Sequence, residues 1–331
     1  MLAAANLAGD FSMKRWALLV AATVLGLASA AALAQSYPSR PVRFVVGFAA
    51  GNGADSVCRI VLDDIRERTG AAIVVENKPG ALGAIGMRAV MAAPADGYTL
   101  MASASATHAS GPNTLAALKN LKPLENLTHV ARLARFDTAV VVNADSPVRS
   151  VQDLAASRGR RSSYGFGTAT FQVAATSFAR AAGIDALSVP YQAQTAALLD
   201  LMAGRVDFVA SDLGTLVPLV QSNRLRPIAL LSDRRSSLLP DVPTAKEAGY
   251  GPLLFGGWVG IDGPKGLPDE VVAWWTGQVR QSLSTPRVRQ KILAAVNMEA
   301  APLFGRDFDA FLQEEQARWA VEAAKAGLRV E

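Results

Sequence analysis

Apolar and polar residues follow two different periods along this chain, and segments with the two periods alternate from residue 42 onward. The segment VRFVVGF at 42–48 is a short apolar run rich in β-branched residues, which predicts a strand. At 54–70 the apolar residues recur every three or four positions, as Val57, Val61 and Ile65 show, which predicts a helix with one buried face. The alternation continues with a strand, a helix and a strand at 71–78, 81–93 and 98–103. We therefore predict a βαβαβ unit with a parallel sheet.

A similar series begins again after residue 137. It predicts strands at 138–143, 206–211 and 225–232, helices at 150–157, 195–204 and 213–223, and a strand, glycine turn and helix within 160–183. A strand, turn and long amphipathic helix over 257–284 and a closing helix over 306–327 complete the chain. We predict two α/β lobes joined by crossing strands, with lobe 1 formed by 37–135 plus 232–331 and lobe 2 formed by 136–231.

The N-terminal segment has the pattern of an export signal. A Lys-Arg pair precedes an apolar run at 16–34, which ends in Ala-Leu-Ala. This pattern predicts a signal peptide over 1–34 with cleavage before Gln35, and hence a periplasmic protein. Residues 1–12 resemble an upstream extension, which leaves the methionines at 1 and 13 as alternative starts. The alternative is a retained membrane anchor, since the apolar run could just span a bilayer.

Composition excludes several classes of protein. The chain has 331 residues and a net charge of +5, but its basic runs, at 157–161 and 232–237, are short and lack interleaved aromatic residues. We interpret them as solvated loops and expect no nucleic-acid partner. One cysteine, Cys58, and two histidines, His108 and His129, make a transition-metal enzyme a poor explanation. We predict no metal and no cofactor.

The first strand is followed by a glycine turn that opens the predicted helix, GFAAGNGADS at 47–56. Gly51 and Gly53 permit unusual backbone angles, and a helix start exposes N–H groups that bind anions. The turn lacks the third glycine of a dinucleotide site and the Lys-Ser/Thr of a phosphate loop. We interpret Asp55 as a cap, or as a handle for a ligand amine or an ordered water, because its carboxylate competes for the same N–H groups.

A second turn of this kind lies in the other half of the chain, as YGFGTATFQ at 164–172. Thr168 and Thr170 add hydroxyl donors. Ligands of open α/β sheets bind at the carboxyl ends of strands, so the two turns are predicted to face each other across a cleft. The alternative for each turn is an ordinary connection between a strand and a helix.

The segment SASATHAS at 103–110 ends the third strand and is predicted to offer Ser105, Thr107 and His108 to the same cleft, although His108 could equally be an ordinary loop histidine. We find no nucleophile elbow, no zinc-protease motif and no group that would orient either histidine as a base. Carboxylates on the predicted helices are interpreted as solvent-exposed groups on the helix surface, as at Asp63, Asp64, Glu314 and Glu315.

Six motifs fall in the order seen in one receptor family: YPSRPVRFVV, DGYTL at 96–100, VPYQ, AGRVDFV, LPDVPTAKEAG at 239–249 and GPKGLPDEVV at 263–272. From Tyr37 to the C-terminus the chain resembles the Bug (TctC-like) family, the periplasmic substrate-binding receptors of tripartite tricarboxylate transporters. The resemblance implies a fold like type II periplasmic-binding proteins, with a ligand cleft between two lobes that close on a small carboxylate. It also implies a partner, the membrane subunits of such a transporter.

The expected protein is a monomeric receptor without catalytic residues. Its predicted ligand-binding residues come from both turns, the third strand and the second lobe: Gly51, Asn52, Gly53, Ala54, Asp55, Ser105, Thr107, His108, Gly167, Thr168, Ala169, Thr170, Gln172, Tyr191 and Asp212. Two alternatives stay open, a ligand-sensing receptor for a signalling membrane protein and an enzyme acting on small carboxylates.

The chain departs from the family pattern in both turns. Ala54 stands where the family has threonine, and Val173 stands where the family often has histidine. Phe166 and Phe171 add apolar bulk to the second turn. Fewer polar donors and more apolar surface predict a ligand that is less charged or more aromatic than citrate.

Overall fold

The computed structural model describes residues 37–156 and 161–327. The elements described below belong to one compact unit that begins at Pro41. The predicted signal peptide and part of the basic run at 157–161 lie outside the described residues. Within the described part of the chain, no helix is both long and apolar enough to cross a membrane.

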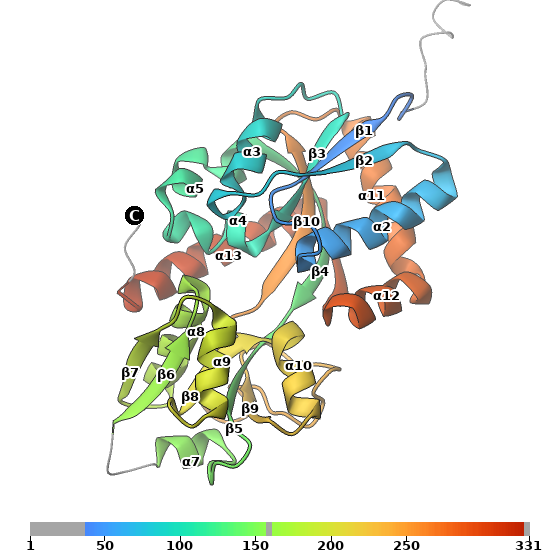
Figure 1. Ribbon diagram of the computed structural model, residues 1–331. Coiled ribbons are helices and arrows are strands. Elements are labelled where there is room, and N and C mark those ends of the chain that lie inside the picture. The colour runs from blue at the N-terminus through green and yellow to red at the C-terminus, as the bar shows by residue number, and fades with distance from the viewer. Residues whose placement is uncertain (1–36, 157–160, 328–331) are drawn as a thin grey trace, which may run out of the picture. The chain divides into compact units, whose positions relative to one another are not determined.

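The first lobe is built on a mixed six-stranded sheet (Figure 1). In spatial order its strands are β11 (Glu299–Phe304), β4 (Leu127–Phe136), β10 (Gly257–Pro264), β3 (Thr99–Ala104), β1 (Val42–Val46) and β2 (Ile73–Asn77). β1 pairs in parallel with both β2 and β3, which confirms the predicted βαβαβ unit. β10, β4 and β11 extend this sheet by antiparallel pairing. Its helices are α2 (Gly53–Thr69), α3 (Ala84–Met91), α4 (Ser105–His108), α5 (Ala116–Leu121), α6 (Pro123–Asn126), α11 (Asp269–Ser284), α12 (Pro286–Val296) and α13 (Gly305–Lys325).

The second lobe is built on a five-stranded sheet. In spatial order its strands are β7 (Ala186–Pro190), β6 (Ser162–Phe166), β8 (Phe208–Asp212), β5 (Thr138–Asn143) and β9 (Leu225–Leu230). β6 is parallel to β7 and β8, whereas β5 is antiparallel to β8 and β9. Its helices are α7 (Val151–Ala155), α8 (Ala169–Ala181), α9 (Gln194–Met202) and α10 (Leu213–Gln221). The two mixed sheets form two α/β lobes, as predicted.

Helix α2 shows how the sequence positions the first turn. Its stripe of Val57, Val61 and Ile65 is fully buried, and burying each such side chain stabilises the fold by roughly 1.5–3 kcal/mol. The helix ends at Gly70, which adopts a left-handed conformation with φ of 71° and donates to the Arg66 carbonyl. The stripe therefore holds the N-terminal end of α2 at the edge of the sheet where β1 ends.

The strand that leads into the second lobe, β4, was not apparent from the sequence. β4 carries a histidine and two arginines among its apolar residues, so its pattern did not indicate a strand. The connection from β4 to β5 is the single residue Asp137, and the chain returns through the segment between β9 and β10. Helix α13 contacts both lobes, because Phe308 packs beside Trp258 whereas Trp319 belongs to the core of the second lobe (Figure 1).

Two of the four helix carboxylates that we interpreted as solvent-exposed are buried in the structure. Asp64 is 4% exposed and accepts hydrogen bonds from Arg68, Ser282 and Arg287. Glu315 is also 4% exposed and accepts from Trp258 Nε1 at 3.1 Å. The interpretation was wrong for these two because the partners Ser282, Arg287 and Trp258 lie far away in the sequence.

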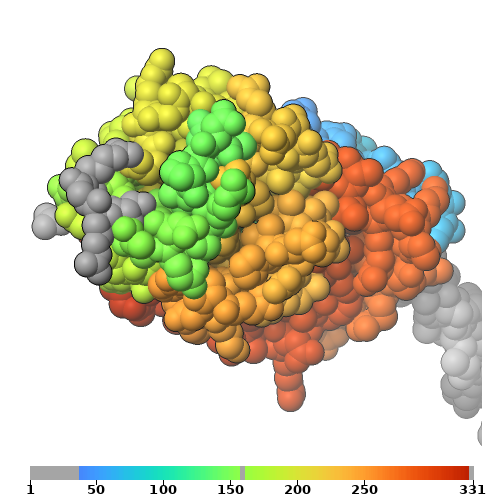
Figure 2. Space-filling view, turned by 90° about the horizontal axis from the view of Figure 1, so that it is seen from below, coloured from blue at the N-terminus to red at the C-terminus, as the bar shows by residue number. Residues whose placement is uncertain are grey.

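Segments distant in the sequence also meet on the outer face of the second lobe. Figure 2 shows the green segment that includes α7 lying against the orange segment that precedes β10. Gln152 Nε2 donates to the Ala248 carbonyl at 3.1 Å across this contact. The segment between β9 and β10 therefore packs on the second lobe before it returns to the first sheet.

Candidate functional site

A cavity of about 460 Å³ lies where the two lobes meet. Its lining comes from the β1–α2 turn, the start of α4, the β4 and β10 ends, the starts of α8 and α10, and the α12–β11 connection: Phe48, Asn52, Gly53, Ala54, Ala104, Ser105, Ala106, Phe136, Phe171, Asp212, Gly214, Thr215, Trp258, Val259, Ala295, Val296, Asn297 and Met298. Both lobes contribute, which is the arrangement expected of a ligand site that closes around its ligand.

The β1–α2 turn contributes Asn52, Gly53 and Ala54 to the lining of this cavity. Asn52 caps the helix by accepting from Ala54 N at 2.8 Å. Asp55 accepts the Gly51 N–H at 2.9 Å. Among the described residues, the N–H groups of Gly53 and Asp55 have no hydrogen-bond partner, and Gly53 lines the cavity. The turn therefore keeps a donor at the positive end of a helix, where an anion binds well.

Asp55 is held by its own network and does not line the cavity. Its carboxylate accepts from Arg59 Nε and from Asn77 Nδ2, both at 2.9 Å, in addition to Gly51 N. Burial alone would raise the pKa of Asp55, but these hydrogen bonds outweigh burial and lower it. Asp55 is therefore ionised at neutral pH and fixes the shape of the turn.

The second glycine turn is used differently. Gly167 N donates to Gln194 Oε1 at 2.8 Å, and Thr168 caps α8 by accepting from Phe171 N at 3.4 Å. A side chain at Gly167 would collide with the backbone nitrogen of Gln194, because an added Cβ would lie 2.1 Å from it. Of the α8 residues, Phe171 lines the cavity. The turn is packed against α9 and presents an aromatic side chain where donors were expected.

Ser105 is the residue of the 103–110 segment whose polar side chain borders the cavity. Its Oγ accepts from Trp258 N at 3.4 Å. Thr107 and His108, which were predicted to face the cleft, are fully buried on the other side of α4. They lie there because one helical turn of four residues directs consecutive side chains to different faces.

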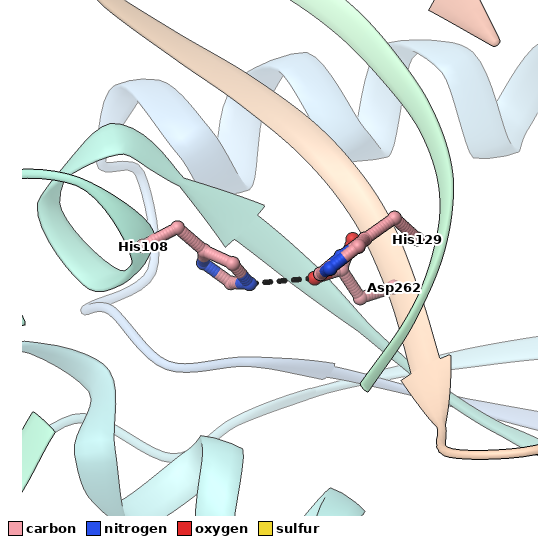
Figure 3. A group of neighbouring side chains, drawn as sticks. All are labelled: His108, His129 and Asp262. Carbon is pink, nitrogen blue, oxygen red and sulfur yellow. Dashed lines mark hydrogen bonds and ion pairs between the residues drawn. The ribbon is translucent and has the colours of Figure 1, made fainter. Parts of the chain in front are cut away.

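His108 takes part in a buried polar cluster with His129 and Asp262 (Figure 3). His108 Nε2 lies 2.7 Å from Asp262 Oδ2, and His129 Nδ1 lies 3.1 Å from the same oxygen. Ser103 Oγ donates to Asp262 Oδ1 at 3.0 Å. Burial opposes charge on His129 and Asp262, but the negative carboxylate raises the pKa of His129, and the two histidines lower the pKa of Asp262. The cluster compensates a buried charge and anchors α4 to β10.

The second lobe contributes Asp212 to the cavity. Asp212 caps α10, and its Oδ1 accepts from Thr215 N at 2.9 Å and from Thr215 Oγ1 at 3.1 Å. Tyr191 instead donates its hydroxyl to Asp200 at 2.8 Å and does not line the cavity. Of the predicted ligand-binding residues, the structure brings together Asn52, Gly53, Ala54, Ser105 and Asp212. The others lie outside the cavity lining: Gly51, Asp55, Thr107, His108, Gly167, Thr168, Ala169, Thr170, Gln172 and Tyr191.

Sequence reasoning missed the α12–β11 connection. Asn297 Nδ2 donates to the Gly214 carbonyl at 3.4 Å, so this connection reaches from the first lobe to the start of α10. Asn297 ends α12 in a left-handed conformation with φ of 52°. An asparagine after an apolar helical run is a helix-end signal that could have located α12, but nothing local indicates that this connection borders a cavity.

The electrostatics of the cavity are unusual for an anion site. Asp212 is the one ionisable side chain in its lining among the described residues, and no lysine or arginine lines it there. Its polar donors are neutral and include Asn52, Ser105, Thr215 and Asn297. Four aromatic side chains also line it: Phe48, Phe136, Phe171 and Trp258.

Two α/β lobes with a cavity between them define a solute-binding protein of the periplasmic-binding-protein type. Residues 57–328 match the model of the tripartite tricarboxylate transporter family receptor, TctC, and the chain belongs to this family. Protein BugT of Bordetella pertussis is similar to this chain, with 27% identity. The similarity covers 90% of this chain and 92% of BugT.

Two solved structures are also similar. R. palustris Rpa4515 with adipate has 28% identity and a TM-score of 0.74, with 89% of this chain and 100% of that chain covered. MatC from Rhodopseudomonas palustris with bound malate has 26% identity and a TM-score of 0.67, with 86% of this chain and 99% of that chain covered.

Proposed function

We propose that this protein is a periplasmic receptor that captures a carboxylate with an apolar body by closure of its two lobes and delivers it to a tripartite transporter. The observation that carries the proposal is the cavity lining, in which neutral donors and four aromatic rings occur without a cationic side chain among the described residues. Neutral donors at a helix start suffice for one carboxylate. Asp212 disfavours a second carboxylate close to the second lobe, because like charges repel.

We infer that the two lobes close on the ligand because each lobe contributes part of the cavity lining. Asn52 and Ser105 belong to the first lobe, whereas Phe171 and Asp212 belong to the second. A ligand that contacts both sets favours the arrangement in which they are close, so its binding shifts the population toward the closed state. We place the hinge at the crossing segments near residues 136 and 231. The function requires binding and release without turnover.

The similar structures support a carboxylate as the ligand. Rpa4515 is described with adipate and MatC with malate, both of which are dicarboxylates. Adipate separates its charges by an apolar chain, whereas citrate concentrates three carboxylates. The aromatic lining of this cavity suits a molecule with an apolar body, because apolar contacts stabilise the body. The start of α2 binds one carboxylate, and a second one, as in adipate, has to lie away from Asp212.

The direct test is calorimetric titration with adipate, 3-phenylpropanoate and citrate. We expect adipate or 3-phenylpropanoate to bind and citrate to bind at least about tenfold more weakly, since buried charge without a partner is costly. Equal or tighter binding of citrate would overturn the proposed ligand class. Turnover of any of these acids would indicate an enzyme instead.

A charge variant tests the helix start. Asn52→Asp keeps a good N-cap residue but places a negative charge in the cavity. We expect it to weaken carboxylate binding by at least about tenfold through like-charge repulsion. Asn223→Asp is the matched control, because Asn223 is exposed, lies outside the cavity lining and has a φ of 53°, which aspartate tolerates. Equal weakening in both variants would contradict the proposed site.

Export and delivery need separate tests. We expect the periplasmic fraction of cells that express the full chain to contain a protein that starts at Gln35. Retention in the membrane fraction would indicate an anchor.

For delivery, we expect the ligand-loaded protein to capture the membrane subunits of a transporter. Capture of a signalling ectodomain instead would indicate a sensing role. Gel filtration is expected to show a monomer.

A further inference from the structure

A second cavity, of about 270 Å³, lies beside the segments that cross between the lobes. Its lining comes from the end of β4, the crossing segments on both sides of the hinge, β11 and α13. Phe136 and Trp258 line this cavity as well as the one between the lobes. The two cavities are therefore neighbours that share these two residues, and we call the second one the hinge cavity.

The hinge cavity contains three arginines and three carboxylates, and most of them are paired. Arg135 forms ion pairs with Asp137 at 3.3 Å and Asp233 at 3.1 Å. Glu315 is paired with Arg318, and it also accepts from the Trp258 indole. The carboxylates of the cavity wall thus already have partners.

Arg132 is the arginine without a carboxylate. Its Nε donates to the Ala301 carbonyl at 2.7 Å, and its guanidinium lies 4.6 Å from the centre of the Phe311 ring. Among the described residues, Arg132 forms no ion pair with a carboxylate, and its two Nη groups make no hydrogen bond. Burial and the charge of Arg135 lower the pKa of Arg132 to about 10, so it remains charged at neutral pH.

A charged, partly desolvated guanidinium with free donors is the group that binds a planar carboxylate with two parallel hydrogen bonds. Besides the paired arginines and carboxylates, the wall has an apolar part that includes Leu231, Leu254, Leu303 and Phe311. This combination of one unpaired cation and an apolar surface defines the ligand chemistry. We propose that the hinge cavity is a second binding site, which holds a small monocarboxylate with a flat apolar body on Arg132.

The test uses benzoate as the probe and weakens binding at the other cavity. Benzoate is titrated calorimetrically into the mature chain carrying Asn52→Asp, and into the same chain with Arg132→Gln or Arg132→Lys added. We expect one-to-one binding in the first protein and at least about tenfold weaker binding with Arg132→Gln, because the charge-assisted bidentate contact is lost. Arg132→Lys should fall between them, since lysine keeps the charge but not the planar fork.

Arg280→Gln on the same background is the control. Arg280 also stacks on a ring, with its guanidinium 4.4 Å from the centre of Phe304, but it does not line the hinge cavity. We expect benzoate binding to be unchanged in this variant. Equal binding with and without Arg132→Gln would overturn the proposal, as would the absence of binding in the Asn52→Asp protein.

The two proposals fail separately. If citrate outcompetes adipate in the wild-type chain, the ligand class of the cavity between the lobes is wrong, but benzoate binding that depends on Arg132 still supports the hinge site. If adipate binds as expected and Arg132→Gln leaves benzoate binding unchanged, the hinge site alone is wrong. Retention of adipate binding by Arg132→Gln also shows that this variant is folded.

Discussion

The starts of helices α2 and α8 look alike in sequence and differ in the structure. Each follows a strand, carries a glycine and begins at a capping residue, Asn52 or Thr168. At α2 the cap bond is 2.8 Å long, and Gly53, whose N–H has no partner among the described residues, lines the cavity. At α8 the cap bond is 3.4 Å long, and Gly167 N is occupied by Gln194. A local turn creates donors, but the neighbours of the turn decide whether a ligand can reach them.

The largest effect is expected from removing the carboxylate that is specific to the α2 start. Asp55→Ala should reduce the free energy of unfolding by about 3 kcal/mol, because a 1% exposed carboxylate loses hydrogen bonds from Gly51, Arg59 and Asn77. Urea denaturation measures this change. Asp63→Ala on the same helix is the control, because Asp63 is exposed, and its loss should change stability by less than about 0.5 kcal/mol. Similar losses in both variants would contradict the assigned role of Asp55.

The corresponding test at α8 is Gly167→Ala. The added methyl group would meet the backbone of Gln194, so the variant should lose about 2 kcal/mol of stability as the turn separates from α9. Gly277→Ala is the control, since Gly277 is exposed in the middle of α11 and an added Cβ would meet nothing within 4 Å. That change should instead stabilise the helix by about 0.5–1 kcal/mol. A stable Gly167→Ala protein would show that the packing against α9 is not tight.

Removing the two caps compares the helix starts directly. Asn52→Ala and Thr168→Ala should each cost about 1 kcal/mol of stability, with the larger loss at Asn52, whose hydrogen bond is shorter. Adipate titration should separate the two variants further. We expect weaker binding with Asn52→Ala and unchanged binding with Thr168→Ala, because Asn52 lines the cavity and Thr168 does not. Weaker binding in the Thr168 variant would mean that the α8 start also contacts the ligand.

We expect the smallest change in stability when the pH is lowered. The folded-state pKa of Asp55 lies below its ordinary value of 3.8. Its stabilising contribution is therefore complete above 3.8 and is lost as the pH falls through the lower folded-state pKa. Denaturation midpoints measured between neutral pH and the acid limit should show this loss in the wild type, and Asp55→Asn should lack that component. Identical pH profiles would show that Asp55 does not titrate differently on folding.

The sequence by itself determined the fold class, the βαβαβ unit, the two α/β lobes and the receptor family. These follow from periodicity, from glycine-marked helix ends and from ordered motifs, all of which are local or linear signals. The stripe of Val57, Val61 and Ile65 is an example, because helix geometry alone places these residues on one face. β4 was missed because His129, Arg132 and Arg135 interrupt its apolar pattern, and they are accommodated by partners on other elements.

Only the tertiary structure decided which residues border the cavity. Phe136, Trp258 and Asn297 come from segments far from either glycine turn, and no local pattern indicates that they meet. His108 was expected in the cleft and instead lies beside Asp262, which follows it by 154 residues, 262 − 108, along the chain. Polar groups acquire their role from the partners that satisfy them, and His108 and Asp262 are brought together only when β10 pairs with β3 and β4 and α4 packs beside it.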